Sequence, residues 1–320
     1  MKTLNDIKKI AVLGAGVMGP GIAQIYAMGG YEVTMWTRSE ATREKAKATL
    51  HNSLVTFAEE SMIPADQVEA IYGRVNFALT VPEAVAGADF IQETIVENAD
   101  AKRDLYNQLA EVVPADVIIA SNTSALNIFE VVPEKLLPQQ IICHWYAPAQ
   151  LIPLVEVVKS EQAPQEFADV AVALLKKCGK EAVFMKKFVR GYIVNRVQQC
   201  LNQEIFWLLD NGYCTAEDID KALKASFIPR AMVLGICKRI DFSGVDMTAN
   251  NFKNHSYSAP QWPEMPKTLA GMMERGEFGT KAGKGFYDYT GMDMAKVMAH
   301  RDKQLFEVFK LAKKFMDDPV

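Results

Sequence analysis

The sequence predicts an α/β protein with a doubly wound, mostly parallel sheet, followed by an all-helical C-terminal domain. A glycine-rich turn lies between an apolar run and a helical pattern near the N-terminus. Stretches typical of strands and of helices then alternate as far as Phe188, which indicates a Rossmann-type sheet. Beyond Phe188 only helical periods remain. We therefore expect two domains, residues 1–188 and 189–320.

The glycine-rich turn follows a predicted strand at 10–13, whose apolar, β-branched composition is typical of a strand buried on both faces. Its glycines have the spacing G-x-G-x-x-G. The first permits the tight turn, the second lets the backbone approach a pyrophosphate, and the third lets the following helix pack closely on the strand. The helix, expected from Val17, would direct its free N–H groups at that phosphate. The sequence thus predicts a dinucleotide site with contacts at Gly14, Gly16, Val17, Met18 and Gly19.

The end of the second predicted strand, 31–36, departs from the usual fingerprint. NAD sites normally carry Asp or Glu there to bind the ribose 2′-OH, whereas this chain has Thr37 followed by Arg38. Without the carboxylate nothing repels a 2′-phosphate, and an arginine can bind one bidentately. We therefore predict NAD(P) as the cofactor, with NADP favoured, and both residues as contacts. The alternative is that Arg38 is a solvated residue beside Ser39, which would cap the next helix.

The remainder of the first domain is expected to continue the alternation. Further strands are predicted at 75–79, 89–93, 117–120, 141–145, 154–158 and 182–185, and helices at 39–60, 64–71, 82–86, 97–112 and 164–177. The strand at 117–120 runs into four small polar residues, SNTS at 121–124. Because ligands bind at the C-terminal ends of strands in open α/β sheets, this loop is a candidate part of the site.

The second domain opens with a helical period over 191–211, whose apolar residues lie nearly all round and predict a helix buried on several sides. Thr215, with Asp218 three residues later, predicts a capping arrangement at the next helix. Helices are expected at 215–225, 229–239, 262–275 and 294–316. Since so small a helical domain is not expected to be self-sufficient, a homodimer through this domain is predicted.

Composition narrows the class of protein. A hydrophobic content of 49%, a charged content of 23% and a net charge of −4 are typical of a globular protein and argue against nucleic acid or an anionic membrane as the partner. The five cysteines contain no C-x-x-C pair, so free thiols in a reducing, cytoplasmic compartment are expected. The N-terminus has no apolar core of a secretory signal. No metal site is predicted, and the expected partner is a small-molecule substrate.

Three polar residues stand in apolar surroundings and suggest the chemistry. His144 ends the predicted strand at 141–145, Glu156 lies within an apolar strand, and Asn195 lies on the first turn of the long helix. An unpaired carboxylate in such a setting is costly. A histidine is its natural partner, because the carboxylate fixes the imidazole tautomer and raises its basicity. We therefore expect His144 and Glu156 to form a pair.

These motifs together resemble those of the L-3-hydroxyacyl-CoA dehydrogenase family, which includes 3-hydroxybutyryl-CoA dehydrogenases. The resemblance covers nearly the whole chain and rests on VLGAGVMGPGIAQ, ETIVENADAK, SNTSALNI, HWYAPAQLIPLVEVV, VRGYIVNRV and GEFGTKAGKGFYDY. It implies a nucleotide-binding domain followed by a helical domain that dimerises. It also implies oxidation of a 3-hydroxyl to a ketone, with hydride passing to the nicotinamide.

The resemblance implies a role for each matching residue. The catalytic histidine falls on His144 and the glutamate that orients it on Glu156. The groups that would hydrogen-bond the reacting oxygen fall on Ser124 and Asn195. Further cofactor contacts fall on Glu97, Lys102 and Asn122. For Glu97 the alternative is an acidic residue at a helix N-terminus, where the helix dipole favours negative charge.

Several departures leave the substrate open. The family usually has Asn-Pro after its histidine and Pro-Gly-Phe before its asparagine, where this chain has Ala147-Pro148 and RGY at 190–192. The helix after the second strand is less lysine-rich than in members that bind CoA, and Pro153 stands where those members tend to have Lys. A CoA thioester is favoured, with a free hydroxy acid of the L-gulonate or carnitine type as the alternative. A non-catalytic nucleotide-binding or structural relative is the second alternative.

Overall fold

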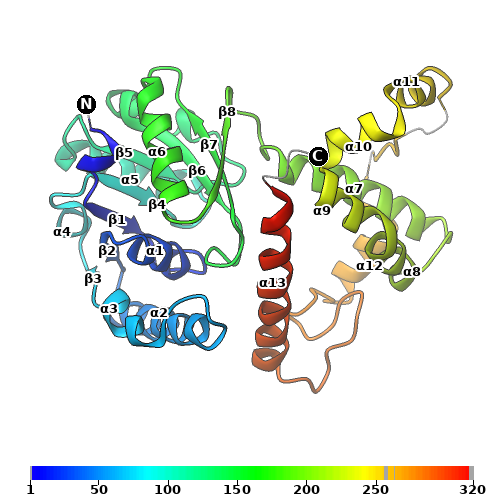
Figure 1. The fold of residues 1–320 in the computed structure, drawn as a ribbon, viewed down its shortest axis with the longest axis horizontal. Coiled ribbons are helices and arrows are strands. Elements are labelled where there is room, and N and C mark those ends of the chain that lie inside the picture. The colour runs from blue at the N-terminus through cyan, green and yellow to red at the C-terminus, as the bar shows by residue number, and fades with distance from the viewer. Residues whose placement is uncertain (1, 256–258, 263, 317–320) are drawn as a thin grey trace. The chain divides into compact units, whose positions relative to one another are not determined.

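The structure is a computed structural model that describes residues 2–255, 259–262 and 264–316. The chain divides after Tyr192 into two compact units, a sheet with flanking helices and an all-helical unit (Figure 1). The division follows from the sequence, because the strand-forming segments end at 185 and every later regular element is helical. Each unit is described separately below.

The first unit contains one eight-stranded sheet with the order β3-β2-β1-β4-β5-β6-β7-β8. Every neighbouring pair is parallel except β6 and β7, so the last two strands run opposite to the first six. All eight predicted strands are confirmed within one or two residues at either end. They are β1 Lys9–Leu13, β2 Glu32–Trp36, β3 Val75–Ala78, β4 Phe90–Glu93, β5 Ile118–Ser121, β6 Gln140–Trp145, β7 Leu154–Lys159 and β8 Glu181–Met185.

Helices connect the parallel strands and cover the sheet (Figure 1). The expected helix at 39–60 is confirmed, since α2 has Ser39 as its N-cap, with the hydroxyl accepting from the Thr42 amide at 3.2 Å. Three starts differ from expectation. The helix expected at 64–71 is a 3-10 turn, Ala65–Gln67, followed by α3 from Val68. The first helix begins at Gly19 rather than at Val17, and the helix expected from Glu97 begins after the capping residue Asn98. The helices are α1 Gly19–Met28, α2 Glu40–Glu59, α3 Val68–Tyr72, α4 Val81–Val85, α5 Ala99–Val112 and α6 Gln165–Lys177.

The core of this unit lies between the sheet and its helices. Central strands β5 and β6 are buried along their whole length, as their unbroken apolar runs predict for strands covered on both faces. One large cluster joins Ala11 and Leu13 of β1 to Leu105 and Leu109 of α5. Such burial stabilises at about 25 cal/mol per Å² of apolar surface. The rigid sheet that results is what positions the polar residues at its strand ends.

The second unit is all-helical, as expected. The capping arrangement of Thr215 with Asp218 is confirmed as a capping box at the start of α8. The helix expected at 229–239 is instead two helices, interrupted at Gly235, whose φ of 74° no helix can contain. An unexpected helix, α11, follows. The helices are α7 Val194–Asp210, α8 Ala216–Ala222, α9 Ile228–Leu234, α10 Ile236–Ser243, α11 Val245–Lys253, α12 Lys267–Glu274 and α13 Met294–Met316.

The expectation for 262–275 is met only in its second half, by α12, and its residue 263 lies outside the described residues. The expectation that the long helix is buried on several sides is wrong for the single chain. No residue of α7 is buried, and Val197 is 50% exposed. Among the described residues, no helix combines the length and the apolar character needed to cross a bilayer.

Candidate active site

The glycine-rich turn joins β1 to α1 and has the backbone geometry that its sequence predicts. Gly14 has φ of 123°, and a Cβ there would lie 2.7 Å from the carbonyl oxygen of Thr94. A Cβ at Gly19 would overlap the carbonyl oxygen of Gly14. A Cβ at Gly16, in contrast, would meet nothing within 4 Å. Two glycines are therefore required by the fold, while the middle one keeps open the space in front of the helix N-terminus, where a phosphate would bind.

This difference predicts opposite effects of adding a methyl group at two positions. Gly16→Ala should weaken NADH binding by about tenfold or more, because the methyl group fills the phosphate space, while the melting temperature without cofactor stays within about 2 °C of the wild type. Titration of protein fluorescence with NADH and thermal unfolding check this. The matched variant Gly19→Ala should instead lower the melting temperature. Equal NADH affinity in Gly16→Ala and the wild type would contradict the assignment.

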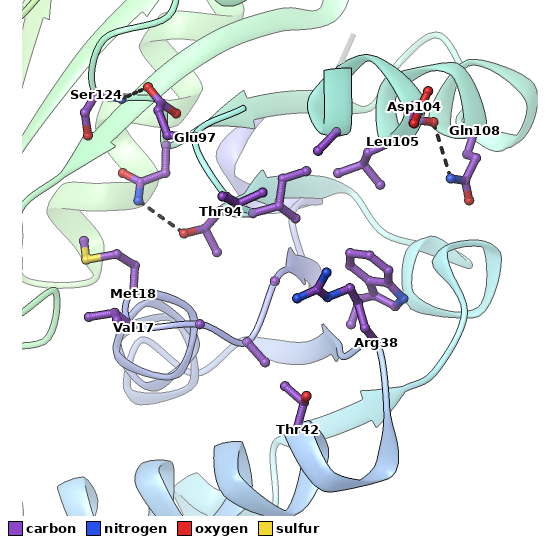
Figure 2. A pocket seen from close by; sticks show the side chains of 18 residues that line it. Val17, Met18, Arg38, Thr42, Thr94, Glu97, Asp104, Leu105, Gln108 and Ser124 are labelled. Carbon is purple, nitrogen blue, oxygen red and sulfur yellow. Dashed lines mark hydrogen bonds between the residues drawn. The ribbon is translucent and has the colours of Figure 1, made fainter. Parts of the chain in front are cut away.

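A cavity of about 620 Å³ opens in front of this turn (Figure 2). That volume is within the range of small-molecule sites. In Figure 2, Val17 and Met18 lie on one side, Ser124 and Glu97 lie together at one end, and Arg38 and Thr42 lie towards the other. The lining therefore comes from the turn after β1, the end of β2, the β4–α5 connection, α5 and the polar loop after β5, all at the C-terminal ends of parallel strands.

At the end of β2 the two predicted contacts differ in position. Arg38 is exposed and lines the cavity. Its guanidinium makes no ion pair with any residue that the structure describes. Thr37 is 1% exposed, and its hydroxyl donates to the carbonyl of Ser39 at 3.4 Å. The arginine is therefore placed to meet a ligand, whereas the part of Thr37 in cofactor binding stays a prediction.

Glu97 binds the polar loop after β5. One carboxylate oxygen, Oε1, accepts hydrogen bonds from the Thr123 hydroxyl at 2.7 Å and from the backbone amides of Ser124 and Ala125 at 2.9 and 2.8 Å. Burial acts to raise the pKa of Glu97, but these hydrogen bonds and the nearby Lys102 outweigh it, so its pKa is lowered. The carboxylate therefore stays charged and fixes the shape of the loop that presents Ser124 to the cavity.

Lys102 is buried beneath this loop. Its ammonium lies 2.6 Å from Oε1 of Glu93 and 3.5 Å from Oε2 of Glu97. Lys102 is 1% exposed and Glu93 is 0% exposed, and the second oxygen of Glu93 accepts from the Ser121 hydroxyl at 2.5 Å. The structure thus gives Lys102 an internal ion pair at the base of the site, and a direct cofactor contact by this residue stays a prediction.

Asn122 connects the loop to the neighbouring strands. Its side-chain oxygen accepts from the Trp145 amide at 2.8 Å, and its side-chain nitrogen donates to the Thr94 hydroxyl at 3.2 Å. Asn122 and Thr94 also line the cavity. Because Trp145 directly follows His144, this hydrogen bond attaches the end of β6 to a residue that lines the cavity.

His144 and Glu156 form the expected pair. They lie directly opposite each other on the antiparallel strands β6 and β7, and Nδ1 of His144 is 3.0 Å from Oε2 of Glu156. Both are buried, at 2% and 0% side-chain exposure. Since a carboxylate accepts from Nδ1–H, the neutral imidazole presents an unprotonated Nε2, which is the form of a base.

Two tyrosines that the sequence analysis did not single out flank this histidine. Tyr192 stacks on the imidazole, with ring centroids 4.5 Å apart and planes at 28°, and its hydroxyl donates to the Thr123 carbonyl at 2.7 Å. Tyr146 meets the imidazole edge-on at 4.6 Å, and its hydroxyl donates to Oε2 of Glu156 at 2.7 Å. The signals available in the sequence were the two departures from the family pattern: RGY at 190–192 contains Tyr192, and Ala147-Pro148 directly follows Tyr146.

The connection between β6 and β7 is held by a buried lysine. The Lys180 ammonium donates to the carbonyls of Ala149 and Ile152 at 2.7 and 2.8 Å and lies 5.3 Å from the centre of the Trp145 ring. Lys180 is 4% exposed, and burial lowers its pKa to about 7. These hydrogen bonds could not be predicted from the sequence, because a lysine before a strand usually faces solvent.

The first unit therefore brings together Ser124 with Glu97 and His144 with Glu156, and Asn122 connects the loop of the first pair to the strand of the second through the Trp145 amide. Asn195 is the second residue of α7, in the other unit, and its meeting with His144 stays a prediction.

A buried histidine–carboxylate pair and a glycine-rich turn at the end of a parallel strand are features that suit a dinucleotide-dependent oxidoreductase, and the class is shown by the family models. The comparisons with known proteins agree. The model for the NAD binding domain of 3-hydroxyacyl-CoA dehydrogenase matches residues 9–188, and the model for its C-terminal domain matches residues 191–289. The chain belongs to the 3-hydroxyacyl-CoA dehydrogenase family.

Similar proteins within the family have different names. A 5-formyl-3-hydroxy-2-methylpyridine 4-carboxylate 5-dehydrogenase from Mesorhizobium japonicum is 31% identical, over 95% of this chain and 98% of the relative. A probable 3-hydroxybutyryl-CoA dehydrogenase from Bacillus subtilis is 32% identical, over 89% of this chain and 98% of the relative. A crystal structure of the pyridine-carboxylate enzyme superposes with a TM-score of 0.84 at 26% identity, covering 96% of this chain and 99% of that one.

Proposed function

We propose that this protein interconverts a 3-hydroxyl and a 3-keto group on a small acyl substrate, with NAD(P) as the redox partner. The observation that carries the proposal is the buried His144–Glu156 pair, whose strand is attached through Asn122 to the loop that lines the dinucleotide cavity. Within the family named above, such a pair has the chemistry of a general base with its orienting carboxylate.

Each residue has a distinct part in the proposed reaction. The glycine-rich turn would hold the nicotinamide cofactor, which would supply the hydride acceptor for oxidation of the hydroxyl and the hydride donor for reduction of the ketone. Nε2 of His144 takes the hydroxyl proton during oxidation and gives it back during reduction. Glu156 holds the ring in the required tautomer and stabilises its protonated form. Ser124 and Asn195 position and polarise the reacting oxygen by hydrogen bonding.

The first proposed substrate class is a 3-hydroxyacyl-CoA of the 3-hydroxybutyryl type, which the family membership favours. The second is a free hydroxy acid, and a specific observation favours it. The C-terminal domain model ends at residue 289, and α13 lies beyond it. A pyridine-carboxylate dehydrogenase and two L-carnitine dehydrogenases match this chain over 95–96% of its length, while a third L-carnitine dehydrogenase matches 81%. The two relatives named for hydroxybutyryl-CoA match 88–89%.

The experiment that tests the proposal is a reduction assay with both substrate classes. Acetoacetyl-CoA and free acetoacetate are each mixed with NADH and with NADPH, and loss of absorbance at the nicotinamide band is followed, with L-carnitine and NAD(P)⁺ as the oxidative counterpart. We expect turnover in at least one combination. A kcat/KM for acetoacetyl-CoA far above that for acetoacetate would assign the CoA class, and the reverse ratio would assign the free acid. Absence of turnover in every combination would contradict the proposal.

We further propose that the cofactor preference leans to NADP. Arg38 lines the cavity where the ribose 2′-substituent of the cofactor would lie, without a carboxylate beside it at Thr37. Arg38→Ala should therefore weaken NADPH binding by about tenfold or more and leave NADH binding within about twofold. Isothermal titration with each cofactor measures this. Equal affinity of the wild type for the two cofactors, with no change in Arg38→Ala, would contradict the lean to NADP.

The last element of the proposal is a homodimer that forms through the helical unit, in a cytoplasmic protein. The dimer is supported by exposed apolar side chains on α7 and α11 in the single chain, among them Val197 at 50% and Phe252 at 79%. All five cysteines are free thiols, which suits a reducing compartment. Light scattering of the purified protein tests the oligomeric state.

A further inference from the structure

The Glu156 carboxylate receives two hydrogen bonds at the same oxygen atom. Oε2 lies 3.0 Å from Nδ1 of His144 and accepts from the Tyr146 hydroxyl at 2.7 Å. Both distances are ordinary for their types, O–H···O and N–H···O, so the phenol and the imidazole share one acceptor atom. Tyr146 follows His144 by two residues, and its ring meets the imidazole edge-on at 4.6 Å. The hydroxyl that competes for the carboxylate is therefore held by the same segment of chain as the histidine it affects.

A hydrogen bond donated to a carboxylate withdraws charge from it. The carboxylate becomes less basic, and its support for a neighbouring imidazolium falls accordingly. Oε2 is buried with Glu156 at 0% exposure, so water does not screen this effect. Removing the phenol oxygen would leave more negative charge facing Nδ1 and would favour the protonated ring.

We propose that Tyr146 is a positioning residue that sets the basicity of the His144–Glu156 pair. This inference rests on the proposed function, in which His144 is the base. The Tyr146 hydroxyl draws negative charge away from the carboxylate oxygen that faces Nδ1, and so reduces the support that Glu156 gives to a protonated imidazole. The segment HWY thereby carries both the base and the group that tunes it.

Four ionisable groups near the pair, Tyr192, Glu93, Glu97 and Cys143, have other partners or surroundings in the part of the chain that the structure describes. Tyr192 stacks on His144, but its hydroxyl donates to the Thr123 carbonyl, and burial, with Glu97, Glu156 and Glu93 nearby, raises its pKa. Glu93 is engaged by Lys102 and Ser121, and Glu97 by the loop that contains Thr123. Cys143, the neighbour of His144 on β6, is a buried thiol whose pKa burial raises.

The test is the pH dependence of Tyr146→Phe, which keeps the ring and removes only the hydroxyl. We expect the acidic limb of kcat/KM for hydroxyl oxidation to move to higher pH by about 0.5 unit, the effect of losing one hydrogen bond of ordinary strength. The matched control is Tyr192→Phe, which removes a hydroxyl at nearly the same ring distance but one that does not touch Glu156. In Tyr192→Phe the acidic limb of the kcat/KM profile should stay at the wild-type pH, even if kcat itself changes. Tyr146→Met serves if Tyr146→Phe folds poorly.

A second readout separates this inference from the proposed function. The chain has only four histidines, so NMR of histidine-labelled protein can follow the His144 ring directly during a pH titration, with His144→Gln assigning its signal. In Tyr146→Phe the midpoint of that titration should rise, with or without turnover of any substrate. An unchanged or lower midpoint would overturn the inference. Absence of turnover in the wild type would overturn the proposed function and leave the titration as the test.

Discussion

Replacing His144 by glutamine should lower kcat for hydroxyl oxidation by about 10²–10⁴-fold. Glutamine keeps a polar group near Glu156 but cannot take the hydroxyl proton, so the loss falls on the chemical step. NADH binding should stay within about twofold, because the cavity that would hold the dinucleotide is lined by the glycine-rich turn and the strand ends, not by the imidazole. Steady-state kinetics and fluorescence titration of the same preparation measure both quantities.

The matched control is His51→Gln. That histidine is 37% exposed and pairs with Glu69 on α3, far along the chain from the site. Its replacement should leave kcat unchanged. A His144→Gln protein that kept near-normal turnover, with folding intact by circular dichroism, would remove the base from the proposed reaction.

Replacing Lys102 by methionine should lower the free energy of unfolding by about 3–5 kcal/mol. Methionine fills most of the volume, but the Glu93 carboxylate loses an ammonium at 2.6 Å in a place with 0% exposure, and an uncompensated buried charge is costly. Glu97 also loses its weaker partner at 3.5 Å, so the loop that carries Ser124 should become less ordered. Urea unfolding followed by circular dichroism gives the stability difference.

Two further variants identify the cause. Lys102→Met combined with Glu93→Gln removes both charges and should recover part of the lost stability, because breaking a buried pair costs more than replacing it. The control Lys135→Met breaks the exposed pair with Glu111, in which the two charged atoms lie 2.9 Å apart. Its loss should lower the free energy of unfolding by no more than about 1 kcal/mol. Equal decreases in the free energy of unfolding for Lys102→Met and Lys135→Met would show that burial does not determine how much an ion pair contributes to stability here.

The sheet unit could be predicted from sequence because each strand is an apolar run bounded by turn residues. The pairing of His144 with Glu156 could also be predicted, since a carboxylate within an apolar strand needs a partner. What could not be predicted is that these residues face each other on an antiparallel pair, because the direction of β7 depends on the path of the connection at 146–153. The same holds for Glu97, which the helical period placed at a helix start and whose hydrogen bonds lie 26 or more residues away in the chain.

The helical unit was harder to predict. Helical periodicity marks where helices lie but not where they break, and the single Gly235 that divides α9 from α10 is tolerated in many helices. The stretch of α11, VDMTANNFK, has too few apolar residues to show a clear period. The aromatic neighbours of His144 were missed for a different reason. From the sequence a tyrosine is most simply interpreted as a core residue. Only the folded strands show that the Tyr146 hydroxyl donates to the Glu156 carboxylate.

The antiparallel pairing of β6 with β7 fixes the register of His144 and Glu156 independently of the connection between the two strands. Side chains alternate along a strand, so a slip of one residue would send Glu156 to the opposite face, and the ladder from Ile141 to Trp145 resists that slip. The connection that Lys180 fastens at Ala149 and Ile152 is not part of the ladder. Exchanges in that connection can therefore change the surroundings of His144, while the ladder keeps the distance between the imidazole and the carboxylate. A family with one reaction and many substrates is the expected product of such an arrangement.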